Sequence, residues 1–225
     1  MSIVYIVSAP SGSGKSTLVN ELFKMVRNLD FSISYTTRPP RGSEQNGKEY
    51  FFVSREKFEA MIAADEFLEY AEVFGNYYGT AKRFLLEAEA RGNDLLLDID
   101  VQGASKIKEK IPEAVSIFIL PPDRDKLEWR LRNRGLDSEA VIRRRLDTAR
   151  REIENYSKYD YILVNNVLEK SADQLKDIVL SERAQRSGVE LSGEEKRRVA
   201  TAQACRLEQT RERVQPILAS FNPQV

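Results

Sequence analysis

The sequence predicts an α/β protein in which helices cover both faces of a parallel sheet. Short apolar runs, such as VSIFIL at residues 115–120, are typical of strands that are buried on both sides. Other segments, such as residues 16–26, repeat apolar residues at the spacing of one helix face. Because the two kinds of segment alternate along the chain, we expect a three-layer α/β/α core with a parallel sheet.

The first apolar run, residues 2–7, leads into a glycine-rich segment, APSGSGKST, from Ala9 to Thr17. A helical pattern follows directly, so that strand, loop and helix come in the order of a phosphate-binding loop. Gly12 and Gly14 allow backbone N–H groups to converge on phosphate oxygens, and the helix start directs its positive end toward the same charge. The alternative is a glycine- and serine-rich connection without a ligand.

This loop predicts a site for the phosphates of a nucleotide. Lys15 would contact the β- and γ-phosphates, and the Ser16 hydroxyl would hold a magnesium ion. Ala9 stands where the general pattern has glycine. The loop residues that we expect to bind the donor nucleotide are Ala9, Pro10, Ser11, Gly12, Ser13, Gly14, Lys15, Ser16 and Thr17.

The sequence changes character between residues 33 and 82. Alternating apolar and polar residues, paired prolines and the turn-forming pair of Asn46 and Gly47 predict small strands. A helix from about residue 55 to 64 precedes an aromatic-rich stretch of strand and turn. Together these segments predict an insertion, after which a helix from about residue 81 to 91 returns to the core.

Two acidic residues, Asp98 and Asp100, end the apolar run that starts at residue 94. In a strand, their spacing puts both on one side at the carboxyl end, which is the edge where ligands of parallel sheets gather. In a protein with a phosphate-binding loop, such acids orient magnesium or its waters, and Asp100 could equally contact an acceptor nucleotide. The alternative for Asp100 is that it caps the next helix.

The second half of the chain continues the alternation of strands and helices. Residues 115–120 end at paired prolines, and an arginine-rich pair of helices follows over residues 123–151. Residues 159–166, YDYILVNN, predict the last strand, and a helix from about residue 171 to 186 closes the core.

A polar tail follows Gly188. Ser192 and Glu195 form a capping box, which predicts a helix that runs toward Arg213 and is stopped by Pro216. Its mixed charges favour a solvated terminal helix, and an arm that binds a partner is the alternative.

The composition argues against several classes of function. The 35 basic and 35 acidic residues balance, so no net charge attracts a nucleic acid. The single cysteine, the absence of a basic segment before the first apolar run and the lack of a membrane-length apolar stretch predict a cytoplasmic protein. Histidine, the commonest general base, is absent, whereas a phosphate acceptor is mostly dianionic near neutral pH and needs no base.

Five segments, in this order, resemble the guanylate kinase family over roughly residues 3–185. They are APSGSGKST, the SxTTRPPR element that starts at Ser34, NGKEYFF, FLEYAEVFGNYYGT and LLLDIDVQGA. Several long motifs at matching spacing are more discriminating than a phosphate-binding loop alone.

The resemblance implies a guanylate kinase-like domain over residues 1–187, followed by a C-terminal helical tail, residues 188–225. Within the domain, it implies a P-loop kinase core made of residues 1–32, 83–122 and 152–187. A subdomain that binds the nucleoside monophosphate (NMP) is inserted at residues 33–82, and residues 123–151 form a helical lid.

The resemblance also implies an activity, the phosphorylation of GMP and dGMP by ATP with Mg²⁺, and no nucleic-acid or membrane partner. The positions that match the family's GMP site, together with the two acids, are Ser34, Arg38, Arg41, Tyr50, Glu69, Tyr78, Thr80, Asp98 and Asp100. An ionised Glu69 can accept hydrogen bonds from both adjacent donors of guanine, whereas adenine presents an acceptor at N1. Ser34 and Thr80 can complete the bonds around the base, while Arg38 and Arg41, with the two tyrosines, suit the acceptor phosphate.

The residues implied in catalysis are Lys15, Arg38, Arg130, Arg134 and Arg145, and those implied in holding magnesium are Ser16 and Asp98. Asn165 matches an asparagine that contacts the adenine of the donor, and a turn-forming role is its alternative. For the arginines of the lid, a solvated face with Glu/Arg pairs is the alternative to a catalytic role, and we expect this face for Arg143, Arg144, Arg150 and Arg151.

Two other functions remain open from the sequence. One is an inactive domain that resembles guanylate kinases and binds phosphopeptides, although its phosphate loop would usually be degraded. The other is a P-loop kinase for a ribose phosphate acceptor, which would not need Glu69.

Overall fold

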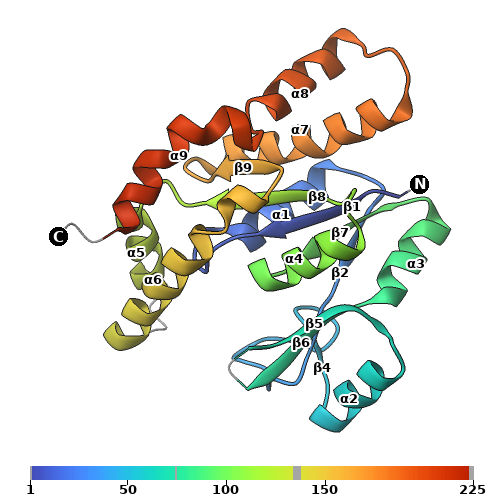
Figure 1. Ribbon diagram of the computed structural model, residues 1–225, viewed down its shortest axis with the longest axis vertical. Coiled ribbons are helices and arrows are strands. Elements are labelled where there is room, and N and C mark those ends of the chain that lie inside the picture. Colours follow the sequence, from blue (N-terminus) through green and yellow to red (C-terminus); the bar gives the residue numbers. More distant parts are fainter. Residues whose placement is uncertain (1, 74, 134–137, 223–225) are drawn as a thin grey trace. The chain divides into compact units, whose positions relative to one another are not determined.

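The computed structural model describes residues 2–73, 75–133 and 138–222 (Figure 1). They belong to two compact units, one made of Met1–Val7 and Asn28–Val115 and the other of Ser8–Arg27 and Ser116–Val225. Within the described ranges, no helix is both long enough and apolar enough to cross a membrane.

The first unit contains three parallel strands, β1 (Val4–Ser8), β2 (Leu29–Ser32) and β7 (Asp94–Asp98). β7 pairs with both β1 and β2. Its residues Leu95, Leu96 and Leu97 are fully buried, so both faces of the strand are covered, which explains its continuous apolar run. Helices α3 (Lys82–Arg91) and α4 (Val101–Lys110) flank β7 in the sequence.

The segment expected to be an insertion forms a second sheet with one helix. Its elements are β3 (Tyr35–Thr36), β4 (Phe51–Phe52), α2 (Arg55–Ala63), β5 (Phe67–Val73) and β6 (Asn76–Ala81). The strands lie in the order β4-β3-β6-β5, which leaves β5 at one end. Phe58, Met61, Phe67 and Ala81 form a separate buried cluster behind this sheet, and the expected small strands and helix are confirmed.

The second unit carries the phosphate-binding loop and the arginine-rich helices. Its elements through residue 187 are α1 (Lys15–Met25), β8 (Val115–Leu120), α5 (Arg124–Asn133), α6 (Glu139–Ile153), a 3-10 turn (Tyr156–Lys158), β9 (Tyr161–Val164) and α7 (Leu168–Ser187). β8 and β9 are parallel, and α1 packs against α7. Parallel strands that alternate with helices confirm the predicted α/β class.

The tail forms two helices, α8 (Gly193–Gln203) and α9 (Leu207–Phe221), so the prediction of one helix stopped by Pro216 is wrong. The capping box of Ser192 and Glu195 is confirmed, but the helix ends at Gln203 and Pro216 lies inside α9. The break has a tertiary cause. Ile162 of β9 donates its N–H to the Cys205 carbonyl at 2.8 Å, and Leu207 donates to the Asp160 carbonyl at 3.1 Å. Backbone groups that pair with a strand cannot also continue a helix.

The interpretation of the tail as a solvated helix is also wrong for one face of α9. Val214, Ile217 and Phe221 are buried, and α9 packs against α5 and β9, as Figure 1 shows. The Tyr161 hydroxyl and the Arg206 guanidinium both donate to Glu182, at 2.5 and 2.9 Å. The tail is therefore part of the core of the second unit.

This packing predicts that the tail contributes to stability. We expect Ile217→Ala to lower the free energy of unfolding by about 2 to 4 kcal/mol, because it removes buried methyl groups and leaves a cavity. Glu212→Ala, at an exposed position of the same helix, should change it by less than about 0.5 kcal/mol. Urea unfolding of both variants measures the difference, and equal stability of the two would show that α9 is not part of the folded core.

Candidate nucleotide-binding sites

The phosphate-binding loop connects β1 to α1, which begins at Lys15. Gly12 and Gly14 have φ angles of 94° and 89°, in the left-handed region that favours glycine. A Cβ at Gly14 would also lie 2.4 Å from Nδ2 of Asn165, and one at Gly12 would lie 2.8 Å from the Leu131 side chain. The two glycines are therefore required by backbone conformation and by close packing.

The side chains of Asn165 and Arg130 both donate hydrogen bonds to a backbone carbonyl of the phosphate-binding loop. The Asn165 side-chain amide donates to the Ser13 carbonyl at 2.7 Å, and Arg130 donates to the same oxygen at 3.3 Å. Arg130 also donates to the Asn165 carbonyl at 2.8 Å. Burial lowers the pKa of Arg130, but a guanidinium still stays charged at neutral pH. These contacts give Asn165 a role that the sequence did not suggest, while its predicted contact with adenine stays a prediction.

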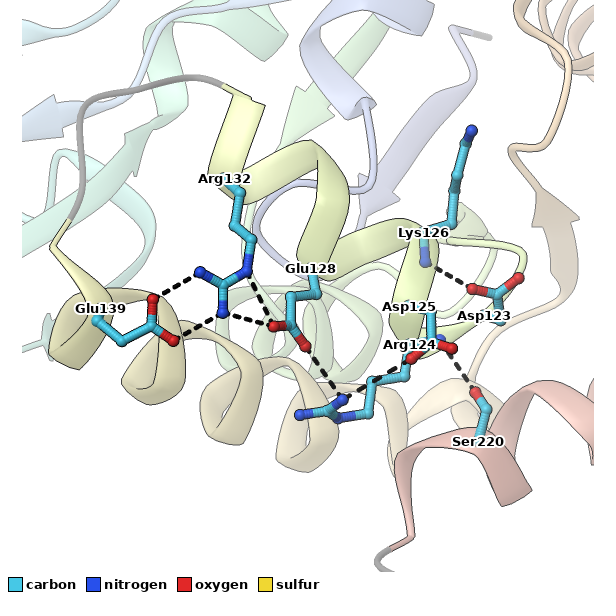
Figure 2. A network of polar contacts seen from close by, with 8 residues as sticks. All are labelled: Asp123, Arg124, Asp125, Lys126, Glu128, Arg132, Glu139 and Ser220. Atoms are coloured by element: carbon cyan, nitrogen blue, oxygen red, sulfur yellow. Dashed lines mark hydrogen bonds and ion pairs between the residues drawn. The ribbon is translucent and has the colours of Figure 1, made fainter.

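The arginines of α5 and α6 divide into two groups. Arg130 and Arg145 reach the phosphate-binding loop, because Arg145 donates to the Ser11 hydroxyl at 2.6 Å. Arg132 instead lies between Glu128 and Glu139, with N···O distances of 2.7 and 2.5 Å (Figure 2). The predicted catalytic residue Arg134 lies outside the described residues.

The exposed ion pairs in Figure 2 link helices α5 and α6. Arg124 pairs with Glu128 at 3.1 Å, and its backbone N–H donates to the Ser220 hydroxyl of α9 at 3.0 Å. The hydrogen bonds from Arg132 hold the pKa of Glu139 below its ordinary value. The two helices thus carry Glu/Arg pairs of the kind expected on a solvated face, at Arg124 and Arg132. The residues for which we predicted such a face, Arg143, Arg144, Arg150 and Arg151, are all exposed.

In the first unit, Arg38, Tyr50 and Tyr78 come together, as expected for a phosphate site. The Arg38 guanidinium is 5.4 Å from the centre of the Tyr50 ring, and the Tyr50 and Tyr78 rings are 6.0 Å apart. Arg38 is only 7% exposed, so its charge requires a partner.

That partner is Glu44, which was not predicted from the sequence. Arg38 donates to both carboxylate oxygens of Glu44 at 3.0 Å, and the Arg41 backbone N–H donates to the same group at 2.8 Å. Burial alone would lower the pKa of Arg38, but these hydrogen bonds and the Glu44 charge outweigh it and raise the pKa. The pKa of Glu44 is lowered in return. An acid six residues after an arginine in a turn-rich segment was the only available signal.

The environment of Tyr50 keeps its hydroxyl protonated. Burial is the largest cause, followed by the nearby Asp98 charge, and together they raise the pKa of Tyr50 to about 12. At neutral pH the hydroxyl can therefore donate a hydrogen bond to an anion, as expected from the sequence.

Glu69 and Thr80 form the part of the site expected to bind the base. Glu69 is 6% exposed, and its carboxylate accepts a 2.8 Å hydrogen bond from the Thr80 hydroxyl. Burial raises the pKa of Glu69 and the Asp100 charge adds to this rise, whereas the Thr80 hydrogen bond opposes it. The Glu69 carboxylate is thus a buried hydrogen-bond acceptor, and Thr80 holds one of its oxygens in place.

Asp100 performs the capping role that was its alternative. One carboxylate oxygen accepts from the backbone N–H groups of Gln102 and Gly103, at 3.0 and 2.8 Å, at the start of α4. Its contact with an acceptor nucleotide stays a prediction. Asp98 ends β7, as predicted, and its charge acts on Tyr50.

Ser34 and Arg41 are less closely tied to the other candidate residues. Ser34 precedes β3, and its carbonyl accepts from the Phe51 N–H at 2.9 Å. Arg41 is exposed, and its backbone N–H donates to Glu44, the carboxylate that also holds Arg38. Their side-chain roles stay predictions.

Comparison with known proteins gives a consistent result. The family model described as guanylate kinase matches residues 1–182. A guanylate kinase from Koribacter versatilis (strain Ellin345) is 61% identical over 221 residues, which cover 97% of this chain and 95% of that protein. One from Neisseria gonorrhoeae is 52% identical over 184 residues, 82% of this chain and 90% of that protein. The crystal structure of guanylate kinase from Anaplasma phagocytophilum matches with a TM-score of 0.67 at 37% identity, covering 80% of this chain and 86% of that chain.

The geometry of the phosphate-binding loop predicts two separable costs at Gly14. Gly14→Ala should lower the free energy of unfolding by about 2 to 4 kcal/mol, because alanine is strained in the left-handed backbone conformation and its Cβ would clash with Asn165. Gly92→Ala is the matched control, since Gly92 has a φ of 68° but nothing within 4 Å of a Cβ. The control should lose only about 1 to 2 kcal/mol. Equal losses in urea unfolding would contradict the close packing of the loop on Asn165.

Proposed function

The chain belongs to the guanylate kinase family, and on this premise we propose that it transfers the γ-phosphoryl group of ATP to GMP and dGMP. The observation that carries the choice of acceptor is the buried Glu69 carboxylate, held by Thr80 at 2.8 Å. A buried carboxylate is a costly group that needs a partner, and the two adjacent donors of guanine supply one. Adenine would place an acceptor against the same oxygen.

On the donor side, the phosphate-binding loop and four cationic side chains stabilise the phosphates of ATP. The backbone N–H groups of the loop and of the first turn of α1 donate hydrogen bonds to the phosphate oxygens, and Lys15 contacts the β- and γ-phosphates. Arg130 and Arg145 lie at the loop already, through Ser13 and Ser11. Arg134 completes this set of arginines in the proposal, and Asn165 contacts the adenine.

On the acceptor side, Arg38, Arg41, Tyr50 and Tyr78 bind the phosphate of GMP. Arg38 is held in place by Glu44 before any ligand arrives, which reduces the entropy lost on binding. Glu69, Thr80, Ser34 and Asp100 surround the base. Together they position the nucleophilic oxygen with little rearrangement.

The reaction is an in-line displacement at the γ-phosphorus. An oxygen of the GMP phosphate forms the new bond, the bond from the γ-phosphorus to the bridging oxygen of ATP breaks, and ADP leaves. The acceptor phosphate has its second pKa at about 6, so no proton has to be removed near neutral pH. This agrees with a chain that contains no histidine.

Mg²⁺ is part of the proposal, with Ser16 and Asp98 as the residues that would hold it. Ser16 is the second residue of α1 and is exposed, and Asp98 ends β7. Hydroxyl and carboxylate oxygens, together with phosphates and water, are the ligands that Mg²⁺ prefers. When bound, the ion neutralises charge on the donor phosphates.

The division of the domain into a core, an NMP-binding insertion at residues 33–82 and a lid at residues 123–151 also stays a proposal. The insertion is supported by its own sheet and buried cluster. The predicted cytoplasmic location stays a prediction, and no described feature favours the phosphopeptide-binding or ribose phosphate alternatives.

The test of the proposed activity is an ADP-release assay that offers GMP, dGMP, AMP, CMP and UMP in parallel. We expect strong preference for the two guanine nucleotides. Lys15→Ala should reduce turnover with GMP by at least about a hundredfold, since it removes a charge at the transferred group, while the variant unfolds at the same temperature. Near-normal turnover in this variant, or equal use of AMP, would overturn the proposal.

The raised pKa of Glu69 predicts a pH dependence of base selection. A raised pKa means that the carboxylate takes up its proton at a higher pH than usual, so the preference for GMP should weaken as pH falls toward that value. The ratio of kcat/KM for GMP to that for inosine monophosphate (IMP) measures this preference, because both share the titrating phosphate and IMP lacks the exocyclic amine. In Glu69→Gln the ratio should be low and independent of pH. A wild-type ratio that is equally flat in the acid range would contradict the role of Glu69.

A further inference from the structure

Two lysines of α4 contact the backbone on both sides of Glu69. Helix α4 packs against β5, the strand that carries Glu69. The Lys110 ammonium donates to the Leu68 carbonyl at 2.5 Å, and the Lys106 ammonium donates to the Tyr70 carbonyl. The residues before and after the candidate base-binding acid are therefore both attached to the same helix.

The position of β5 in its sheet explains why these contacts matter. β5 is the last strand in the order β4-β3-β6-β5, so no strand of the described residues pairs with its outer edge. Leu68 and Tyr70 are two residues apart, and their carbonyls point to the same edge of the strand. An unpaired edge presents backbone N–H and C=O groups that can pair with another chain unless another element covers them. Here the two lysines take the place of a neighbouring strand.

The first turn of α4 approaches the Glu69 side chain itself. A Cβ at Gly103 would lie 3.2 Å from both Cδ and Oε2 of Glu69, which is closer than ordinary van der Waals contact. Gly103 also donates its N–H to Asp100 at 2.8 Å. Gly103, Lys106 and Lys110 are spaced by three and four residues, which places them on one face of the helix.

We propose that this face of α4 positions the Glu69 carboxylate for guanine, with Lys106 and Lys110 fixing the strand and Gly103 leaving space for the side chain. The inference rests on the proposed function, because it assigns a specificity role within the same acceptor site. Lys106 and Lys110 are positioning residues, since they act through the backbone around Glu69 and not on the nucleotide.

The charges of Lys106 and Lys110 also favour the ionised form of Glu69, which is the form that accepts hydrogen bonds from guanine. The charged and titratable groups that act on Glu69 are Asp100, Lys106 and Lys110, and Thr80 of β6 donates to it. Burial raises the pKa of Glu69 and Asp100 adds to the rise, whereas Thr80 and the two lysine charges oppose it. Loss of a lysine charge should therefore raise the pKa further and make guanine recognition more sensitive to acid.

The first experiment compares Lys106→Met and Lys110→Met with Lys108→Met, measuring kcat and KM for GMP and IMP at saturating ATP. Lys108 is the matched control on the same helix, because its ammonium donates to the carbonyls of Pro112 and Ala114, away from β5. We expect KM for GMP to rise about 3- to 10-fold in each of the first two variants, with kcat nearly unchanged. The GMP-to-IMP ratio should fall, and its acid decline should begin at a higher pH. The control should show none of these changes.

Gly103→Ala separates positioning from stability. Alanine is the better helix former, so we expect the free energy of unfolding to stay equal or rise. We expect the GMP-to-IMP ratio to fall at least about threefold, because the carboxylate must move by a few tenths of an ångström. A stable variant with unchanged base preference would overturn the role of Gly103.

A double-mutant cycle with Glu69→Gln distinguishes failure of this inference from failure of the proposed function. If Lys106 and Lys110 act through Glu69, their effect on the GMP-to-IMP ratio should disappear in the Glu69→Gln background. If Glu69→Gln lowers the ratio but the lysine variants do not, the positioning role is wrong and the proposed function stands. If Glu69→Gln itself leaves the ratio unchanged, the proposed base recognition fails with it. Lysine effects that persist in full without Glu69 would also overturn the inference.

Discussion

The candidate sites depend on one physical constraint, the cost of keeping a charged group away from water until its ligand arrives. Arg38 and Glu69 are 7% and 6% exposed, so neither can rely on solvent to stabilise its charge. Glu44 holds Arg38 through two hydrogen bonds, and Thr80 holds one oxygen of Glu69. The partners fix the direction of each side chain as well as its charge. Pre-formed geometry of this kind lowers the entropy that a substrate would otherwise lose when it binds.

A related constraint, the cost of leaving a buried backbone carbonyl without a hydrogen bond, explains the form of the phosphate-binding loop. The loop must present N–H groups to an anion, so its carbonyls have to be satisfied from the other side. Asn165 and Arg130 both donate to the Ser13 carbonyl and do so from elements far away in the sequence. Gly14 must lack a Cβ because Asn165 approaches to within 2.4 Å of where that atom would lie. The glycines are therefore required by the packing of the loop against Asn165 and Leu131 as well as by its backbone conformation.

What could be predicted from the sequence follows from how local each feature is. The order of strand, glycine-rich turn and helix at residues 4–25, the buried strand at residues 115–120 and the capping box at Ser192 are set by neighbouring residues, and all three are confirmed. The candidate acceptor residues came from a resemblance between long motifs, and the structure brings Arg38, Tyr50 and Tyr78 together. Glu44, Gly103 and the contact of Asn165 with the loop could not be predicted, because each depends on which segments the fold places side by side. No periodicity in the sequence carries that information.

The tail illustrates the same limit most clearly. Its composition is polar, and a proline stands where a helix could end, so local rules favour one short solvated helix. In the fold, β9 offers an edge, and the chain at Cys205 and Leu207 pairs with it. Pairing with that edge ends α8, and the following residues then bury Ile217 and Phe221 as α9 in spite of the proline. An interior proline removes one backbone hydrogen bond, at a cost of about 3 kcal/mol, and a helix that buries several large apolar side chains can offset this. The family model ends at residue 182, before these helices, yet the Koribacter relative aligns over 97% of the chain. An extension that covers a sheet edge and packs on α5 is therefore a structural part of this protein, since removing it would expose both the edge and the apolar face beneath it.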